Sequence, residues 1–419
     1  MDILFLADNF PPERNAQASR VYERARYWVQ WGHRVTVITC APNFPEGKVY
    51  EGYRNRWHQS EEMSGIRVVR VKTFLAPNAG RVLRILDFLS FMASAFVAGL
   101  FERRPDVVAA TSPQLFAGVA GCALAAARRV PFVLELSDLW PDSVVAVGAM
   151  RRNVALWWLE KVELGMYRRA ARIVALTKAF KGNLVGRGID EGKIEVVVNG
   201  VELSQSAPRE KDKELGKHLG LANEHFVVGY IGTHGMAHAL DSVLRAASLD
   251  GDGSIRFLFV GAGAERSRLV AEAERMGLRN VVFVPAQPKE TMPSYWSLCD
   301  VALVHLKDTP LFETVIPSKI FEAMGMGLPI LLAAPKGEAS NLLTESGAGL
   351  WAPPERPQEL LEAVCLLRDN QALYRLMSSC SRAAAPRYSR EKQARKMLAV
   401  LEDATGRQGM SKGAAASAA

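Results

Sequence analysis

The sequence contains little cysteine, and no spacing pairs the cysteines it has. Its five cysteines are far apart and none stands in a Cys-x-x-Cys motif, so neither a zinc ribbon nor a thiol redox pair is encoded. This usage is typical of a reducing compartment. A Gly-x-Ser-x-Gly motif and short internal repeats are also missing, which removes support for a serine hydrolase and for a solenoid.

What is present is ordinary globular composition in a long chain. The 419 residues are 49% apolar and 23% charged, which excludes a disordered or collagen-like protein. At roughly 150 residues per domain, this length predicts two to three domains. Residues 1–8 have no basic leader, so we expect a first strand there rather than a secretion signal.

Positive charge is concentrated in the first half of the chain. Through Gly200 there are 27 Lys and Arg against 19 Asp and Glu, whereas the remainder has 25 of each. A one-sided balance indicates an anionic partner for the first half: a lipid headgroup surface, a diphosphate-bearing acceptor or nucleic acid. A basic surface that serves only solubility is the alternative.

Strand patterns alternate with helical patterns along nearly the whole chain, which predicts an α/β fold of parallel sheets covered by helices. Two doubly wound domains follow, 1–200 and 201–386, with a last helix at 387–404, and a ligand is expected beside the carboxyl ends of the strands. The tail 405–419 is rich in Gly, Ala and Ser, so we expect it to be disordered. The expected strands are 3–7, 34–39, 66–71, 106–111, 131–136, 172–176 and 194–198, then 226–232, 255–260, 281–284, 301–304, 329–332 and 349–351.

An apolar stretch in the first half allows two interpretations. Residues 88–101 form a run of 14 uncharged residues flanked by arginines, shorter than the roughly 18 to 20 residues that span a bilayer. It is either a buried helix of the first domain or a helix with an apolar face at the membrane interface. The basic segment 151–187, which contains Trp157 and Trp158, favours some membrane contact.

Glycine-rich junctions in the second half suit phosphate binding. Gly232, Thr233, His234 and Gly235 follow a predicted strand and precede a predicted helix, where backbone N–H groups and the helix N-terminus favour an anion. Residues 260–264 have the same position. Both junctions are equally compatible with a tight strand-to-helix turn that simply needs glycine.

A denser group of chemical residues occupies 317–329. Pro317 and Ser318 predict a helix start, which places Lys319 in the first turn and Glu322 about one turn later on roughly the same face. The lysine suits a phosphate, and the carboxylate suits two sugar hydroxyls. The alternative is an ordinary surface pair of opposite charges.

Five motifs follow one another along the chain: 8–12 (DNFPP), 137–143 (SDLWPDS), 199–201 (NGV), 232–236 (GTHGM) and 317–329 (PSKIFEAMGMGLP). In this order they resemble the GT-B glycosyltransferases of family 4, especially the branch that builds bacterial surface polysaccharides such as O-antigen, capsule and exopolysaccharide. The resemblance covers nearly the whole chain. It implies two Rossmann-like domains that face a cleft, with a C-terminal helix that crosses back to the N-domain.

The resemblance also implies roles for individual residues. The nucleotide sugar would bind in the second domain, with Glu322 on the ribose. The family places a first glutamate eight residues earlier, where this chain has Thr314. Either the loop shifts so that the neighbouring Glu313 takes this role, or the donor sugar is recognised differently. The remaining implied residues are donor-binding Gly232, Thr233, His234, Gly235, Ser318 and Lys319, acceptor-binding Asn9 and Phe10, and Asp138 for the acceptor hydroxyl.

The sequence thus predicts a retaining glycosyltransferase of surface polysaccharide synthesis. The donor would be a nucleotide-diphosphate sugar, with UDP favoured and an N-acetylated amino sugar as one candidate. The acceptor would be a lipid-linked glycan. The enzyme would be cytoplasmic and peripheral on an anionic inner membrane surface, with no nucleic acid partner. A nucleotide-sugar 2-epimerase of the same fold and a non-catalytic membrane adaptor are the alternatives.

No metal cofactor is expected. Asp250 and Asp252 spell an Asp-x-Asp pair, but they lie in a glycine-rich connection between a predicted helix and strand. His234 and His238 are four residues apart without a third ligand nearby in the sequence, so a metal site there has little support.

Overall fold

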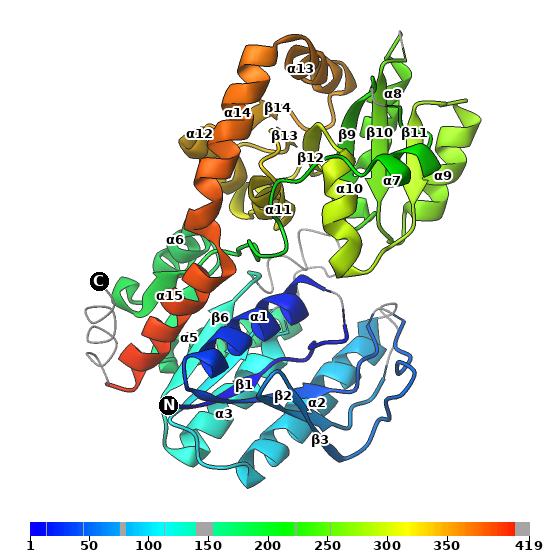
Figure 1. Cartoon of the computed structure of the whole chain (residues 1–419). Coiled ribbons are helices and arrows are strands. Elements are labelled where there is room, and N and C mark those ends of the chain that lie inside the picture. The colour runs from blue at the N-terminus through cyan, green and yellow to red at the C-terminus, as the bar shows by residue number, and fades with distance from the viewer. Residues whose placement is uncertain are drawn as a thin grey trace. The chain divides into compact units, whose positions relative to one another are not determined.

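The computed structural model describes residues 1–406 apart from 14, 45, 76–80, 113, 140–153, 223 and 252. The chain divides into two units (Figure 1). Unit 1 holds Met1–Val198 and the residues from Gln393 onward, and unit 2 holds Asn199–Lys392. The C-terminal helix thus returns to the first unit, as the resemblance implies. Three predicted features lie outside the described residues, wholly or in part: 140–143 of the SDLWPDS motif, Asp252, and the tail from 407.

Unit 1 is built on an eight-stranded sheet in the order β3-β4-β2-β1-β5-β6-β7-β8. All neighbouring strands are parallel except the β3–β4 pair. The strands are β1 (Asp2–Leu6), β2 (Arg34–Cys40), β3 (His58–Met63), β4 (Ile66–Val71), β5 (Val107–Thr111), β6 (Phe132–Leu136), β7 (Arg172–Ala175) and β8 (Ile194–Val196). The helices are α1 (Ala16–Gln30), α2 (Arg81–Phe101), α3 (Leu115–Arg128), α5 (Val154–Arg169) and α6 (Lys178–Gly186).

The edge strand β3 was missed by the sequence patterns. Its residues, HQSEEM, are polar and alternate between exposed and half-buried positions, so they lack the apolar run of a central strand. The link to β4 is the pair Ser64 and Gly65, with φ of 52° and 77°. Two consecutive positive φ angles are the signature of a type I′ hairpin turn, which makes this edge antiparallel.

The last helix, α15 (Arg390–Ala404), packs against α1 in unit 1. Figure 1 shows α15 in red beside α1 in blue, and the Trp28 indole N–H donates to the Ala394 carbonyl at 3.0 Å. Met397 and Leu401 are fully buried in the same apolar cluster as Trp28. An ion pair between Arg172 and Asp403 ties the end of the helix to β7.

Unit 2 is built on a six-stranded, all-parallel sheet in the order β11-β10-β9-β12-β13-β14. Every strand was predicted. The strands are β9 (Phe226–Ile231), β10 (Ile255–Val260), β11 (Val281–Val284), β12 (Val301–His305), β13 (Ile330–Ala333) and β14 (Gly349–Ala352). The helices are α7 (Lys213–His218), α8 (Leu240–Ser248), α9 (Arg266–Arg275), α10 (Met292–Leu298), α11 (Lys319–Met326), α12 (Glu338–Ser346), α13 (Pro357–Asp369) and α14 (Gln371–Ala384).

Helix α2 has one buried face and one exposed apolar face. Phe91 and Ala95 are buried, and Gly99 lies against the Leu124 side chain of α3. The helix is longer than the uncharged run suggested. Within the described residues, Leu83–Phe101 is the one helix long and apolar enough to cross a membrane by length and composition, and 22% of it is buried. The exposed large side chains are Leu83, Ile85, Leu86, Leu89, Val97, Leu100 and Phe101.

Candidate functional site

The strand order of unit 2 identifies where a ligand is expected. Crossovers run from β9 outward to β10 and β11, then reverse at β12. In open parallel sheets, ligands bind beyond the carboxyl ends of the strands at such a reversal. Strand β9 ends at Ile231 and is followed by Gly232, whereas β12 ends at His305. The predicted donor loop therefore begins at the switch point.

The two glycine-rich junctions pack directly against each other. Gly232, Gly261 and Gly263 have φ of 146°, 151° and 155°, which are unfavourable for other residues. A Cβ on Gly261 would lie 2.0 Å from the Gly232 carbonyl oxygen, and one on Gly263 would lie 2.2 Å from that of His234. The 260–264 junction thus serves close backbone packing and supports the loop after β9.

Lys319 is a buried cation beside this loop. The residue is only 8% exposed, and its Nζ has no hydrogen-bond partner among the residues that the structure describes. Nζ lies 3.6 Å from the centroid of the Tyr230 ring, and a Cβ on Gly232 would be 3.1 Å from it. Burial lowers the pKa of Lys319 to about 7, partly opposed by the charge of Glu322.

The start of α11 adds donors to the same place. Ser318 is its N-cap residue, but its side chain makes no capping hydrogen bond. The first N–H groups of a helix have no partners inside the helix and favour an anion. The structure thus brings together the glycine loop, Lys319 and a helix N-terminus, as the sequence predicts for a phosphate site.

His234 lies in the loop, but its side chain is fully buried and does not face solvent as the side chain of an exposed phosphate ligand would. Its ring contacts Tyr230, Phe259 and Phe283, and both ring nitrogens lack partners within the described part of the chain. Burial lowers the pKa of His234 to about 4 and that of His238 to about 3. Both rings are therefore neutral at pH 7 and add no charge beside Lys319.

The two glutamates have different surroundings. Glu322 is half-buried, and the Trp296 indole N–H donates to its Oε2 at 3.4 Å. Glu313 is exposed in the short 3-10 helix Pro310–Thr314. Its backbone is held by Gly337, where an added Cβ would lie 2.0 Å from the Glu313 carbonyl oxygen. The structure thus anchors the Glu313 main chain and leaves its carboxylate at the surface.

In unit 1 the strand order reverses between β1 and β5, so the segment after β1 meets the corresponding switch point. Asn9 is half-buried there and accepts a hydrogen bond from the Asn15 amide at 2.8 Å. Phe10 is fully buried and packs edge-on against Tyr22. Its side chain belongs to the core, which leaves the backbone of Phe10 for the predicted acceptor contact, and that contact stays a prediction.

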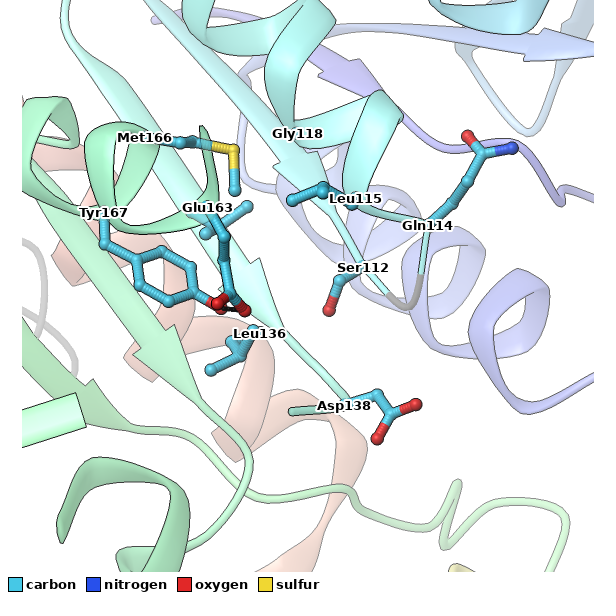
Figure 2. A pocket seen from close by; sticks show the side chains of 10 residues that line it. Ser112, Gln114, Leu115, Gly118, Leu136, Asp138, Glu163, Met166 and Tyr167 are labelled. Atoms are coloured by element: carbon cyan, nitrogen blue, oxygen red, sulfur yellow. Dashed lines mark hydrogen bonds between the residues drawn. The ribbon is translucent and has the colours of Figure 1, made fainter. Parts of the chain in front are cut away.

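Asp138 follows β6 at the rim of a small cavity (Figure 2). The cavity volume of about 10 Å³ suits a single water molecule and not a sugar. Behind it, the buried Glu163 carboxylate accepts hydrogen bonds from Tyr167 at 2.5 Å and Arg187 at 2.6 Å. The cavity lining is Ser112, Gln114, Leu115, Gly118, Leu134, Leu136, Asp138, Glu163, Met166 and Tyr167.

Tyr230 and Trp296 were given no role from the sequence, although both contact predicted donor residues. Tyr230 stands inside the glycine-rich segment, and strand alternation places it on the same face as Phe226 and Val228. Trp296 is separated by 26 residues from Glu322, so no local spacing connects them. Among the residues described, no three His, Cys, Asp or Glu side chains are grouped as metal ligands.

Comparisons with known proteins agree with this arrangement. The family described as Glycosyltransferase Family 4 matches residues 17–205, and Glycosyl transferases group 1 matches residues 225–370. Escherichia coli WcaI, named for colanic acid biosynthesis glycosyl transfer, is 24% identical over 87% of this chain and 91% of its own. A Mycobacterium tuberculosis GDP-mannose-dependent alpha-mannosyltransferase is 27% identical over 89% of this chain and 90% of its own.

Solved structures show the same fold at low identity. Anabaena HepE in complex with UDP has a TM-score of 0.73 at 18% identity, covering 96% of this chain and 100% of its own. WaaG, a glycosyltransferase involved in lipopolysaccharide biosynthesis, has a TM-score of 0.70 at 14% identity, covering 95% and 99%. The two family matches, the relatives and the paired parallel sheets together show that the chain belongs to the GT-B glycosyltransferases of family 4, of the surface-polysaccharide type.

Proposed function

We propose that the protein is a retaining glycosyltransferase that moves a sugar from a nucleotide-diphosphate donor to a lipid-linked glycan. The observation that carries the donor assignment is Lys319, a buried cation at the switch point of unit 2 whose Nζ has no hydrogen-bond partner in the described part of the chain. Leaving a charge buried and unpaired is costly. A diphosphate would supply the missing negative charge, and the glycine loop and the start of α11 would add N–H donors.

The same groups suit the chemistry of transfer. The bond between the anomeric carbon and the diphosphate oxygen breaks, and its electron pair leaves with the diphosphate. Lys319 and the backbone N–H groups would stabilise that charge as it develops. The acceptor oxygen bonds to the same face of the anomeric carbon, so the configuration is retained without a protein nucleophile. Asp138 is our candidate to orient the acceptor hydroxyl and take its proton.

For the nucleotide, we favour UDP. HepE was solved with UDP, with UDP and glucose, and with UDP-glucose, whereas the mycobacterial relative is named for GDP-mannose. Glu322, held by Trp296, would accept hydrogen bonds from the ribose hydroxyls. Glu313 at the surface would reach the donor sugar in place of the glutamate that is missing at Thr314. We expect no metal requirement, because Lys319 would neutralise the leaving group.

For the acceptor, we propose a lipid-linked glycan at the cytoplasmic face of a membrane. Unit 1 exposes the apolar side chains of α2 together with Val154, Trp157, Trp158 and Val162 on α5. Exposed apolar patches mark interaction sites, and tryptophan is suited to the headgroup region. The excess of positive charge through Gly200 would favour an anionic bilayer.

The proposal is tested first by ligand-induced thermal shifts with UDP, GDP, ADP and dTDP. A nucleotide at about 100 times its Kd stabilises the protein by roughly 2.7 kcal/mol. Lys319→Met should reduce that shift, because loss of the charged partner weakens binding by about tenfold to a hundredfold. The matched control is Lys336→Met, which removes an exposed lysine stacked on Trp351 in the same unit and should preserve the shift.

The second step is transfer itself. Nucleotide sugars that contain the nucleotide found to bind would be added as donors, and a membrane lipid extract would supply the acceptor. NMR would then give the anomeric configuration of the product. Retention is expected. An inverted product would refute the retaining mechanism, and binding of none of the four nucleotides would refute the donor site.

A further inference from the structure

We propose that Tyr230 is the positioning residue of the donor site, because its ring seats the Lys319 ammonium while its hydroxyl fixes the loop after β9. This inference rests on the proposed function, since it takes the donor diphosphate as the anion bound by Lys319. Tyr230 itself would touch no substrate. It would act by holding two anion-binding elements in one arrangement before the donor arrives.

The first half of the role is the contact with the cation. Nζ of Lys319 lies 3.6 Å from the centroid of the Tyr230 ring, which is well within the range of about 6 Å for a cation–π contact. The tyrosine is 1% exposed, so water does not weaken the contact. An aromatic ring attracts a cation but carries no net negative charge. The contact therefore positions the Lys319 ammonium without neutralising its charge.

The second half is the contact with the loop. The Tyr230 hydroxyl donates to the Thr233 carbonyl oxygen at 2.8 Å. Thr233 stands between Gly232 and His234, whose backbones are packed against Gly261 and Gly263. The hydroxyl therefore fixes the orientation of the Thr233 carbonyl, and the N–H of the same peptide unit, that of His234, donates to the Ala262 carbonyl at 2.8 Å.

The ring is itself held in place by its neighbours. His234, His238 and Phe259 lie with their ring centroids 5.9, 5.8 and 6.0 Å from that of Tyr230. Burial keeps both histidines neutral by lowering their pKa values to about 4 and about 3. Since they do not repel the ammonium, they leave Nζ free to rest against the Tyr230 ring.

The test is a double-mutant cycle on nucleotide affinity, measured by calorimetry with the full-length protein. The probe is UDP, or whichever of GDP, ADP and dTDP binds the wild type. Tyr230→Leu removes the ring and should weaken binding by roughly threefold to thirtyfold. In a Lys319→Met background, the same change should have far less effect, because the residue acts through the lysine.

Two further variants separate positioning from general loss of packing. Phe226→Leu removes a ring from the same strand and the same apolar cluster, at the opposite end of β9, and should lower the unfolding temperature without changing affinity. Tyr230→Phe keeps the ring and loses only the bond to Thr233. Lys319→Met should therefore weaken nucleotide binding as much in the Tyr230→Phe protein as in wild type. Tyr230→Phe itself should cost a little affinity, by the same amount with and without Lys319.

The outcomes are distinct. A Tyr230→Leu effect that is equally large with and without Lys319 would overturn the inference and leave the donor site standing. If Tyr230→Leu does not fold, the other two variants decide. The inference would be overturned if Lys319→Met no longer weakened nucleotide binding in the Tyr230→Phe protein, or if Phe226→Leu weakened nucleotide binding. Absence of nucleotide binding by the wild type would overturn the proposed function, and the inference with it.

Discussion

Lys319→Met should make the ligand-free protein more stable while it weakens donor binding. The burial of Lys319 lowers its pKa from 10.5 to about 7. At roughly 1.4 kcal/mol per unit, charging this lysine costs up to about 5 kcal/mol more in the folded protein than in the unfolded chain. Methionine keeps most of the apolar stem and removes the charge, so we expect about 3 to 5 kcal/mol of added stability at about pH 6.

The stability advantage of Lys319→Met should depend on pH. Between the folded pKa of about 7 and the unfolded value of 10.5, the unfolded chain binds the proton more tightly, so protonation favours unfolding. The cost is complete below pH 7 and disappears as the pH rises toward 10.5. The advantage of Lys319→Met should therefore shrink by about 2 kcal/mol between about pH 6 and pH 8.5.

Urea unfolding of the two proteins at both pH values, followed by tryptophan fluorescence, measures the difference directly. Lys336→Met is the control, because its exposed lysine should give no gain at either pH. A Lys319→Met protein that is no more stable than wild type at about pH 6, or an advantage that does not change with pH, would refute the assignment of Lys319 as an uncompensated buried cation.

Four other predictions follow from the same geometry. Glu322→Gln should weaken nucleotide binding by about tenfold to a hundredfold in calorimetry, whereas the exposed Glu359→Gln should not. Burial raises the pKa of Glu135, but its ion pairs with Arg20 and Arg24 outweigh this effect and lower the pKa below 4.5. In urea unfolding at pH 7, Glu135→Gln should therefore be about 3 kcal/mol less stable than wild type. This deficit should fade as the pH falls below 4.5. Transfer should continue in EDTA, and activity abolished by EDTA and restored by magnesium or manganese would refute the metal-free proposal. Flotation with anionic vesicles should decrease at high salt and in a Leu86→Ser, Val97→Ser, Phe101→Ser variant, but not in the unit 2 control Leu376→Ser; wild-type protein that stays soluble on anionic vesicles at low salt would contradict membrane contact.

The central strands of the sheets were predictable because they are buried on both faces. Such strands appear as short apolar runs between turn residues, and all six strands of unit 2 were found in this way. Strand β3 lacks this signal, since one side of its HQSEEM sequence faces solvent. Phe10 is the opposite case. Its place in a loop motif indicated binding, but only the folded core reveals that Tyr22 covers its ring.

The site was predictable only as a set of separate pieces. Spacing placed Lys319 and Glu322 on one face of a helix and placed Gly232 at a strand end. It could not place Nζ of Lys319 over Tyr230. Tyr230 is in β9 and Lys319 is in α11, and only the fold of unit 2 brings these distant segments together. For the same reason, the contact of Trp296 with Glu322 and the packing of Gly263 on His234 required the structure.

Comparison with the other buried charges of the chain explains why Lys319 is the informative residue. Glu135 is paired with Arg20 at 3.0 Å, and Glu163 is paired with Arg187 at 2.6 Å. Arg70 is paired with Glu61 at 2.5 Å. Folding thus supplies these three buried charges with a partner of opposite charge, as stability requires. Lys319 is also buried, and among the described residues its Nζ rests on an aromatic ring in place of a carboxylate, where the strand order of unit 2 reverses. An unfavourable arrangement of this kind is retained where function needs it. Because the missing partner would be an anion, the instability of the free site and the proposed affinity for a diphosphate would have the same physical origin.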